Sequence, residues 1–357
     1  MESPKNKALV TVIIATYNRP DVLSTAIRSV QSQTIKDWVC YVIGDGCSQS
    51  TQDLMDRIDD DRVFYYNNPF RYGEQAGGNS IGMALAETEY IAFLNHDDLW
   101  TPNHLEVAIS SLKNNNTDFY IGRAAMSRLV ENGVPKFKMV NPVNRKPYYG
   151  FLAHYMLSEP VSSWVLKTDK AMEIGYWKRK IELYRSSAQE YIMRAWRKRI
   201  KFDYGKKITS AYLSYHNNRE LRKGSQKTSY EYKGKENEYI LKLFQKKYDD
   251  FEELIKPDKL TEHKFKKINP IPPKSMKLLH IILRTIYNVV FNKVTAYLYY
   301  FTGIDIYTIA GKIFLSKDWR VRVRERALRN KTGDTKIKMH NMEEVIEYAK
   351  KHFPKTT

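Results

Sequence analysis

The sequence predicts an α/β fold in which helices flank a mostly parallel sheet and a helical extension follows at the C-terminal end. Short β-branched apolar runs alternate with amphipathic stretches over residues 8–123, the pattern of parallel strands joined by crossover helices. The length of 357 residues suggests about two domains. A hydrophobic content of 42% with 13% aromatic residues excludes a disordered chain.

The predicted elements follow in order along the chain. Apolar runs predict strands at residues 9–15, 38–43, 63–66, 89–95, 119–122 and 161–166. Amphipathic spacing predicts helices at about 20–31, 74–87, 102–114, 188–198 and 237–248.

Three parts are predicted from this pattern. Residues 1–220 form the first domain, with a regular half at about 8–123 and a less regular half at about 124–220. Residues 221–274 hold a basic loop, a helix and a linker that contains prolines. Residues 275–357 form a helical basic tail in which apolar residues recur every three or four positions.

The net charge of +19 is unevenly distributed. Residues 1–100 carry 8 Lys and Arg against 14 Asp and Glu, whereas the other 257 residues carry 51 against 26. A basic second part implies an anionic partner. For residues 275–330 we expect amphipathic helices that lie on an anionic membrane surface; a helical subdomain packed on the first domain and a dimer interface are the alternatives.

The compartment follows from the cysteines and from the apolar segments. Cys40 and Cys47 are the only cysteines, and no secretory h-region or long uncharged apolar run occurs. This combination predicts a cytoplasmic protein, with the tail peripheral on the inner face of the membrane.

Asp97 and Asp98 follow the apolar strand at 89–95 directly. Open α/β sheets bind ligands at the carboxyl ends of such strands. Two adjacent carboxylates repel each other and resist desolvation, which favours a divalent cation with oxygen ligands that can in turn hold a diphosphate. The alternative is an acidic cap for the helix that opens at Thr101-Pro102.

Asp45 lies between two glycines after the second strand, at the same edge of the sheet. Its carboxylate could accept a hydrogen bond from the imide of a uracil or from a guanine edge. A turn aspartate is the alternative. Neither a dinucleotide fingerprint nor a P-loop occurs in the required strand–turn–helix context.

Four motifs in register give the sequence a family resemblance. They are Val12-Ile13-Ile14-Ala15-Thr16-Tyr17-Asn18-Arg19, Gly44-Asp45-Gly46-Cys47-Ser48, Gly77-Gly78-Asn79-Ser80-Ile81-Gly82 and Asn95-His96-Asp97-Asp98. Over about residues 8–220 the chain resembles the family 2 glycosyltransferases of GT-A fold, which is Rossmann-like. The resemblance implies a nucleotide-sugar half at about 8–123 and an acceptor half at about 124–220.

The resemblance also implies roles for single residues. The nucleotide-binding positions are Thr16, Tyr17, Asn18, Asp45, Asn79 and Asn95. Asp97, Asp98 and His216 resemble the metal and diphosphate end, with Mn²⁺ or Mg²⁺ as the cofactor. Asn95 stands where the family usually has Asp, which is the departure of this chain from the pattern.

The stretch at 187–196 resembles the acceptor-side helix of the family. Glu190 occupies the position of the general base, which would deprotonate an acceptor hydroxyl. An acid paired with Arg194 one turn later is the alternative.

Further contacts with the substrates are predicted before and after that helix in the sequence. Ser163 and Trp164 lie where the acceptor is expected, with a core position as the alternative for Trp164. Arg219 and Arg222 are candidates for the leaving diphosphate, with a solvated loop as the alternative.

The resemblance implies an inverting transferase that moves a sugar from a nucleotide-sugar, with UDP as the expected nucleotide, to a hydroxyl of a glycan or lipid-linked acceptor. Surface polysaccharide or glycolipid synthesis is the expected setting. An inactive homologue that serves as a nucleotide-binding scaffold, a nucleotidyltransferase and a nucleic-acid-binding protein are the alternatives. No nucleic-acid partner is expected, because the basic residues avoid the ligand edge and no known module occurs.

Overall fold

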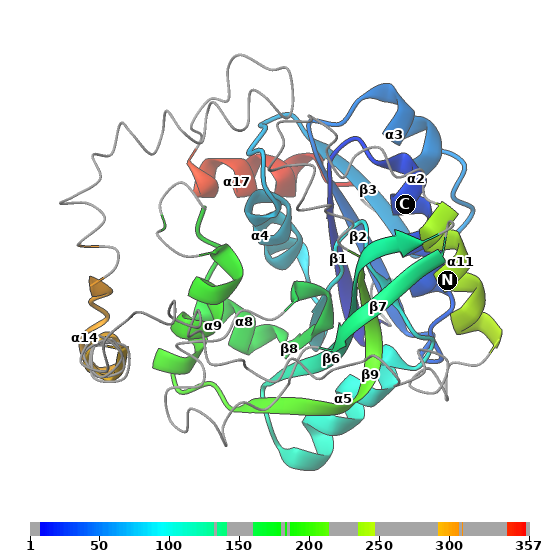
Figure 1. The fold of residues 1–357 in the computed structure, drawn as a ribbon. Coiled ribbons are helices and arrows are strands. Elements are labelled where there is room, and N and C mark those ends of the chain that lie inside the picture. Colours follow the sequence, from blue (N-terminus) through cyan, green and yellow to red (C-terminus); the bar gives the residue numbers. More distant parts are fainter. Residues whose placement is uncertain are drawn as a thin grey trace, which may run out of the picture.

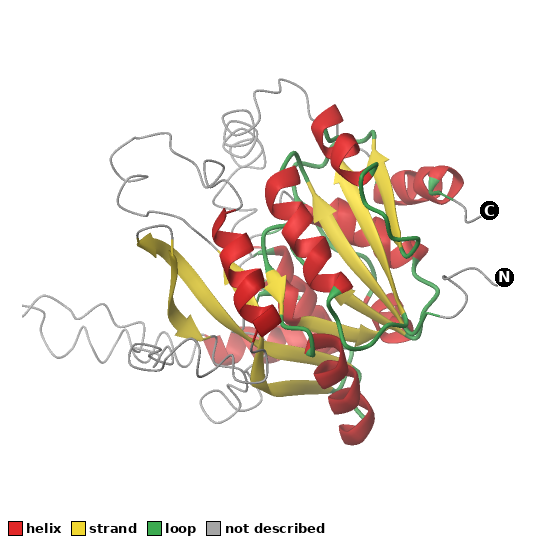
Figure 2. Cartoon of the chain, turned by 90° about the vertical axis from the view of Figure 1, so that its right-hand side faces the viewer, coloured by secondary structure: helices red, strands yellow, loops and turns green. Residues whose placement is uncertain are grey.

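The computed structural model describes residues 8–131, 134–140, 160–179, 183, 186–213, 235–246, 292–306, 309 and 341–354. In these residues a mixed sheet lies between layers of helices (Figures 1 and 2). The predicted α/β fold is thereby confirmed.

The sheet contains nine strands in the order β3-β2-β1-β4-β8-β6-β9-β5, and β7 pairs with β6. In chain order the strands are β1 (Val10–Thr16), β2 (Trp38–Asp45), β3 (Val63–Asn68), β4 (Tyr90–Phe93), β5 (Leu99–Trp100), β6 (Phe119–Glu131), β7 (Val134–Val140), β8 (Trp164–Lys167) and β9 (Phe202–Leu213). β8 runs antiparallel to both β4 and β6, and β9 runs parallel to β6.

The described helices cover both faces of the sheet. They are α2 (Pro20–Gln31), α3 (Gln49–Met55), α4 (Gln75–Leu85), α5 (His104–Asn115), the 3₁₀ helix η2 (Val161–Ser163), α8 (Thr168–Ile174), α9 (Ser187–Arg197), α11 (Lys235–Lys246), α14 (Asn292–Thr302) and α17 (Met342–His352).

Alternating side chains divide the core between the two faces. In β1, Val12 and Ile14 pack among residues of α2 and α5, whereas Ile13 faces the opposite side, toward α4. A Cβ on Gly78 of α4 would lie 2.7 Å from the Cβ of Ala15. The paired glycines of this motif therefore let α4 lie directly on β1.

The parallel strands bring four loops to one edge of the sheet. β1 pairs with β2 and β4, and β2 pairs with β3, so that Thr16 is level with Gly44 and Gly44 with Asn67. We call the loops that follow β1, β2, β3 and β4 the carboxyl edge. The predicted nucleotide-binding and metal-binding motifs of the first hundred residues all lie there or on α4.

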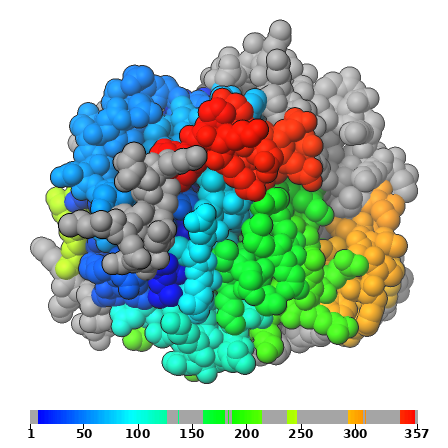
Figure 3. Space-filling view, turned by 180° about the vertical axis from the view of Figure 1, so that it is seen from behind, coloured from blue at the N-terminus to red at the C-terminus, as the bar shows by residue number. Residues whose placement is uncertain are grey.

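The described helices beyond residue 220 pack on the first domain. α11 contacts α2, β5 and β7, and α14 contacts α9. α17 lies against α4 and β3, and Figure 3 shows it in red on the surface beside the cyan residues of α4. Of these, the contact of α14 matches the alternative for residues 275–330 of a helical part that packs on the first domain.

Most of the segment predicted to contact a membrane lies outside the described residues. Of residues 275–330, the structure describes 292–306 and 309. There α14 buries Thr295 and Ala296 and exposes Val294, Tyr297 and Phe301. No described helix is both long enough and apolar enough to cross a bilayer. Membrane contact stays a prediction.

Replacement of Phe353 by Ala tests how firmly α17 is docked. The ring of Phe353 is buried at the end of α17 and lies 4.8 Å from the ring of Tyr41 in an edge-to-face contact. We expect Phe353→Ala to lower the free energy of unfolding by about 3–4 kcal/mol, because the cavity adds to the lost burial. Urea unfolding measures this value. Lys351→Ala, an exposed position on the same helix, is the control, and equal effects of the two variants would contradict the docking.

Candidate functional site

Side-chain hydrogen bonds join the loops of the carboxyl edge. Asn18 lies in the left-handed region at φ 47°, which Asn tolerates, and its Oδ1 accepts the backbone N–H of Ser48 at 2.6 Å. The amide of Asn67 both accepts from Cys47 N at 2.8 Å and donates to Cys47 O at 2.9 Å. The loop after β1 and the end of strand β3 at Asn67 thus both hold the loop after β2.

Asp45 holds a further part of the same edge. Its two carboxylate oxygens accept the backbone N–H groups of Tyr72 at 2.7 Å and Gly73 at 2.6 Å. Burial raises the pKa of Asp45 to about 6, although these two N–H groups and the charges of Arg71 and Arg179 act in the opposite direction. Asp45 therefore fastens the loop after β3, and each oxygen keeps lone pairs for a ligand.

Two arginines that the sequence did not point to lie at this edge. The guanidinium of Arg71 lies 4.1 Å from the ring centroid of Tyr17, and that of Arg179 lies 4.6 Å from the ring centroid of Tyr72. Arg71 follows a predicted strand, so applying the strand-end rule to the third strand would have found it. Arg179 had no such signal, because tertiary packing alone brings it here.

Thr16 and Asn79 each leave a buried polar atom without a partner. Both side chains are at most 3% exposed. In the part of the chain that the structure describes, Thr16 Oγ1 and Asn79 Nδ2 make no hydrogen bond. Buried polar groups are nearly always hydrogen-bonded in folded proteins, and the polar atoms of a ligand are one kind of partner that could complete these two.

Asp98 serves the fold rather than an open ligand site. Its side chain is fully buried. Oδ2 accepts from Ser162 Oγ and from Asn95 Nδ2 at 2.9 Å, and Oδ1 accepts from Leu213 N at 2.9 Å. Burial and the neighbouring charge of Asp97 raise the pKa of Asp98. Both oxygens of Asp98 are thus engaged by protein donors, which favours a structural role, and its assignment as a metal ligand stays a prediction.

These bonds also explain the departure at position 95. The Asn95 amide donates to Asp98, and its backbone N–H donates to Ser162 Oγ at 3.0 Å. An aspartate at 95 would replace the donor by a second carboxylate beside a buried one, which is strongly unfavourable. Asn therefore suits the inward position of Asp98.

Asp97 is the acid that remains for a cation. It is half-buried, and within the described residues no hydrogen bond or ion pair engages its carboxylate. Its backbone carbonyl accepts from Asn237 Nδ2 of α11 at 3.1 Å, which fixes the chain at this point. No group of three or more His, Cys, Asp or Glu that is placed to hold a metal ion occurs among the described residues. One carboxylate suits Mg²⁺ or Mn²⁺ when substrate phosphates and water supply the other ligands.

Three predicted residues cannot be placed at the site. His216, Arg219 and Arg222 lie outside the described residues. Their roles toward the metal and the diphosphate stay predictions.

Glu190 lies in the first turn of α9 and is paired with two cations. Arg194 donates to both carboxylate oxygens, at 3.1 Å from Nε and 3.0 Å from Nη2, and Lys178 Nζ lies 3.0 Å from Oε1. The pair with Arg194 predicted as the alternative is thus present. The role of Glu190 as the base stays a prediction.

The model of glycosyl transferase family 2 matches residues 11–164, which include β1 to β4 and the whole carboxyl edge. This segment of the chain belongs to glycosyl transferase family 2.

Curated relatives match parts of the chain. The chain is 34% identical over 114 residues to the UDP-Glc:alpha-D-GlcNAc-diphosphoundecaprenol beta-1,3-glucosyltransferase WfgD of Escherichia coli, covering 32% of this chain and 45% of the relative. It is 35% identical over 92 residues to the GalNAc(5)-diNAcBac-PP-undecaprenol beta-1,3-glucosyltransferase of Campylobacter jejuni, covering 25% and 29%. The matches span less than half of each relative. The crystal structure of S. aureus TarS 1-349 in complex with UDP superposes with a TM-score of 0.47 at 17% identity, over 57% of this chain and 60% of that one.

At the end of the family 2 segment, two predicted acceptor contacts are corrected. Trp164 is fully buried, with its ring stacked 5.6 Å from that of Trp177, so it belongs to the core. Ser163 is also fully buried, and its hydroxyl donates to Pro160 O at 2.8 Å. Neither side chain is available to an acceptor.

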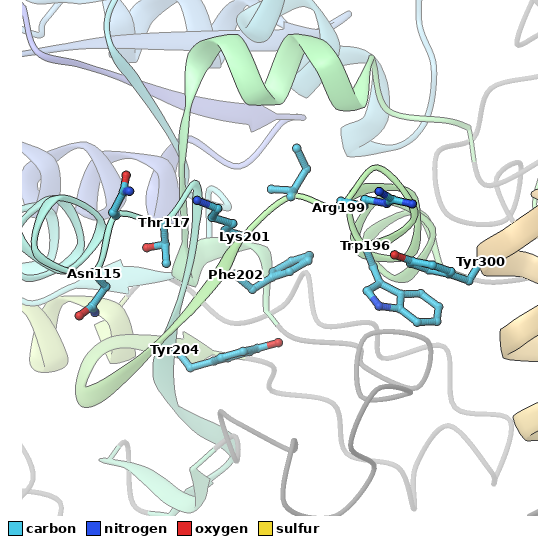
Figure 4. Close-up of a pocket in the computed structure, with 10 residues that line it drawn as sticks. Asn115, Thr117, Trp196, Arg199, Lys201, Phe202, Tyr204 and Tyr300 are labelled. Carbon is cyan, nitrogen blue, oxygen red and sulfur yellow. The ribbon is translucent and has the colours of Figure 1, made fainter.

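A pocket of about 530 Å³ lies away from the carboxyl edge of the family 2 segment. It is at the end of the sheet where β6 and β9 begin, and Figure 4 shows aromatic rings from α9, β9 and α14 around it. Its lining includes Asn115, Thr117, Trp196, Arg199, Lys201, Phe202, Tyr204 and Tyr300. None of the predicted site residues lines it.

The raised pKa of Asp45 predicts a pH dependence of stability. Asp45 has a pKa of about 6 in the fold and about 4 when unfolded, so the folded state binds the extra proton between these values. The stabilisation by that proton is present below about pH 4 and is lost as the pH rises through about 6. Relative to Asp45→Asn, the wild type should gain up to about 3 kcal/mol of unfolding free energy between pH 7 and pH 4. Urea unfolding at each pH measures the difference, and a difference that stays constant would contradict the raised pKa.

Proposed function

We propose that this protein is an inverting glycosyltransferase that moves a sugar from a UDP-sugar to a hydroxyl of a lipid-linked saccharide. The observation that carries the proposal is the carboxyl edge of the family 2 segment, with Asp45 at the end of β2, and the unsatisfied polar atoms of Thr16 at the end of β1 and of Asn79 on α4. The names of both curated relatives describe transfer to undecaprenol-linked acceptors, and one names UDP-Glc as the donor. Surface polysaccharide synthesis is the setting that we propose for this transfer.

Recognition of the nucleotide would rest on the first two strand ends. The ring of Tyr17 lies against the Arg71 guanidinium and offers a surface for a planar base. The carboxylate of Asp45 accepts an imide N–H, and the hydroxyl of Thr16 and the amide of Asn79 supply further polar contacts. A flat ring, a hydrogen-bond acceptor and fixed polar groups suit the recognition of a uracil base. A site that bound only phosphate would not need them.

The diphosphate would lie toward the end of β4. Asp97 is the residue that would hold Mn²⁺ or Mg²⁺ there. When bound, the cation supplies neutralisation of charge on the leaving diphosphate. Asp98 positions Asp97 by holding the chain at the next residue.

Glu190 would accept the proton of the attacking hydroxyl. Lys178 is 51% exposed and can turn to water at little cost, whereas Arg194 is 14% exposed and stays paired. The oxygen released by Lys178 then takes the proton while the hydroxyl oxygen bonds to the anomeric carbon. The bond from that carbon to the diphosphate oxygen breaks on the opposite face, so that the configuration inverts.

Ligand binding tests the donor and the metal together. A UDP-sugar should raise the thermal stability of the protein more than GDP- or dTDP-sugars do, because only the folded state binds it. A further rise with Mn²⁺ should disappear in Asp97→Asn, whose own stability should stay within about 0.5 kcal/mol of the wild type.

Asp98→Asn is the matched variant for that experiment. An asparagine can present only one acceptor oxygen to the three donors around position 98, so we expect a loss of about 1–3 kcal/mol in unfolding free energy. The Mn²⁺-dependent rise should persist in this variant. Loss of that rise in Asp98→Asn but not in Asp97→Asn would contradict the assignment, and no stabilisation by any nucleotide-sugar would overturn the proposed function.

Glu190→Gln tests the base. The variant should keep its affinity for UDP and lose about 10²–10⁴-fold in the rate of transfer from the UDP-sugar to an undecaprenyl-diphosphate-linked GlcNAc acceptor. Arg194→Met is the control, because it breaks the ion pair and keeps the carboxylate. If both variants slow transfer equally, the ion pair rather than the base is what matters at Glu190.

A further inference from the structure

Arg179 is a buried cation to which the proposed mechanism gives no task. It is 6% exposed, and its Nε is buried without a hydrogen-bond partner. In the described part of the chain, its guanidinium contacts the ring of Tyr72 and makes no hydrogen bond or ion pair. Arginine is almost never buried unpaired, because desolvation of the charge is costly.

The backbone beside Arg179 is held in place. Trp177 donates its N–H to Ser80 Oγ of α4 at 3.1 Å, and its ring lies 5.4 Å from that of Phe93 of β4. These contacts anchor the chain two residues before Arg179. The guanidinium is therefore kept at its position by packing and not by polar bonds of its own.

The surroundings of Arg179 belong to the carboxyl edge. Tyr72, on which it stacks, is fastened by Asp45 and packs on Gly77 in the first turn of α4, where a Cβ would lie 2.7 Å from the ring. Asp45 acts on Arg179 only at a distance, because its oxygens are taken by backbone N–H groups. The nearby carboxylate thus leaves the hydrogen-bonding groups of Arg179 unused.

We propose that Arg179 binds an oxyanion of the nucleotide-sugar donor, either the diphosphate or a carboxylate on the transferred sugar. This inference rests on the proposed function, since it assigns a contact within the same site. The planar guanidinium offers paired N–H donors that match the oxygens of phosphate and carboxylate. Burial strengthens such a contact because little water competes for it.

The test compares ligands with and without the anion. Calorimetric titration at constant Mg²⁺ gives dissociation constants of UDP and uridine for the wild type, Arg179→Met and Arg179→Lys. Arg179→Met should weaken UDP about 10- to 100-fold and uridine less than about 2-fold, as expected for a charged hydrogen-bonding contact. Arg179→Lys should fall between, because it keeps the charge and loses the fork.

Arg62→Met is the matched control. Arg62 also stacks on an aromatic ring, 3.8 Å from the centroid of Trp38, but pairs with Asp60 before β3 begins, away from the carboxyl edge. It should leave the affinities of both ligands unchanged. Circular dichroism on each variant confirms that the fold is retained.

A second pair of ligands identifies the anion. If UDP binds Arg179→Met as it binds the wild type but UDP-glucuronate is weakened relative to UDP-glucose, Arg179 binds a sugar carboxylate. If UDP, uridine and both UDP-sugars change by one common factor, or none changes, Arg179 is a packing residue and the inference is overturned. If the wild type binds neither UDP nor uridine, the proposed function fails and the inference fails with it.

Discussion

The buried carboxylate of Asp98 is the interaction on which both halves of the catalytic domain depend. It collects donors from the end of β4 through Asn95, from η2 through Ser162 and from β9 through Leu213. Ser162 and Leu213 lie 64 and 115 positions from it in sequence. Because a carboxyl group deep in a protein must keep its hydrogen bonds, any change in the relative position of these three segments would leave a buried polar group unsatisfied. Asp98 thus sets the place where the parallel strands meet the later part of the sheet.

The two adjacent acids therefore have different roles: Asp98 is a structural residue, and Asp97 is the one proposed to bind a cation. Residues 95–98 form a turn, in which the N–H of Asp98 donates to the carbonyl of Asn95 at 3.1 Å, and the two carboxylates have different surroundings. Asp98 faces inward and is satisfied by protein donors, whereas Asp97 is half-buried and has none among the described residues. The asparagine at 95 belongs with the inward member. The departure from the family pattern is therefore consistent with one metal-binding carboxylate rather than with loss of the site.

The parts that could be predicted from the sequence are those with local causes. The strands that became β1, β2 and β4 are continuous apolar runs, and the strand-end rule then placed Asp45 and Asp97 at one edge. β9 was not predicted, because it mixes lysines and small polar residues with apolar ones and is completed by β6, some 80 residues away. Trp164 was assigned to the acceptor for a related reason. The sequence pattern of an aromatic residue beside a strand end is the same whether or not Trp177 covers its ring in the fold.

The carboxyl edge shows how the fold can keep polar groups ready for a ligand. Thr16 and Asn79 are immobilised by the close approach of α4 to β1, which Gly78 allows. Arg179 is held by the anchoring of Trp177 and by the ring of Tyr72. In each case apolar or backbone contacts fix the side chain, while a buried polar atom is left unpaired. Such an arrangement lowers stability without ligand, because each unpaired group carries its desolvation penalty. The same penalty is relieved only by a ligand whose donors and anions meet these atoms, so polar groups that packing alone holds in place would make the site selective for the ligand that completes them.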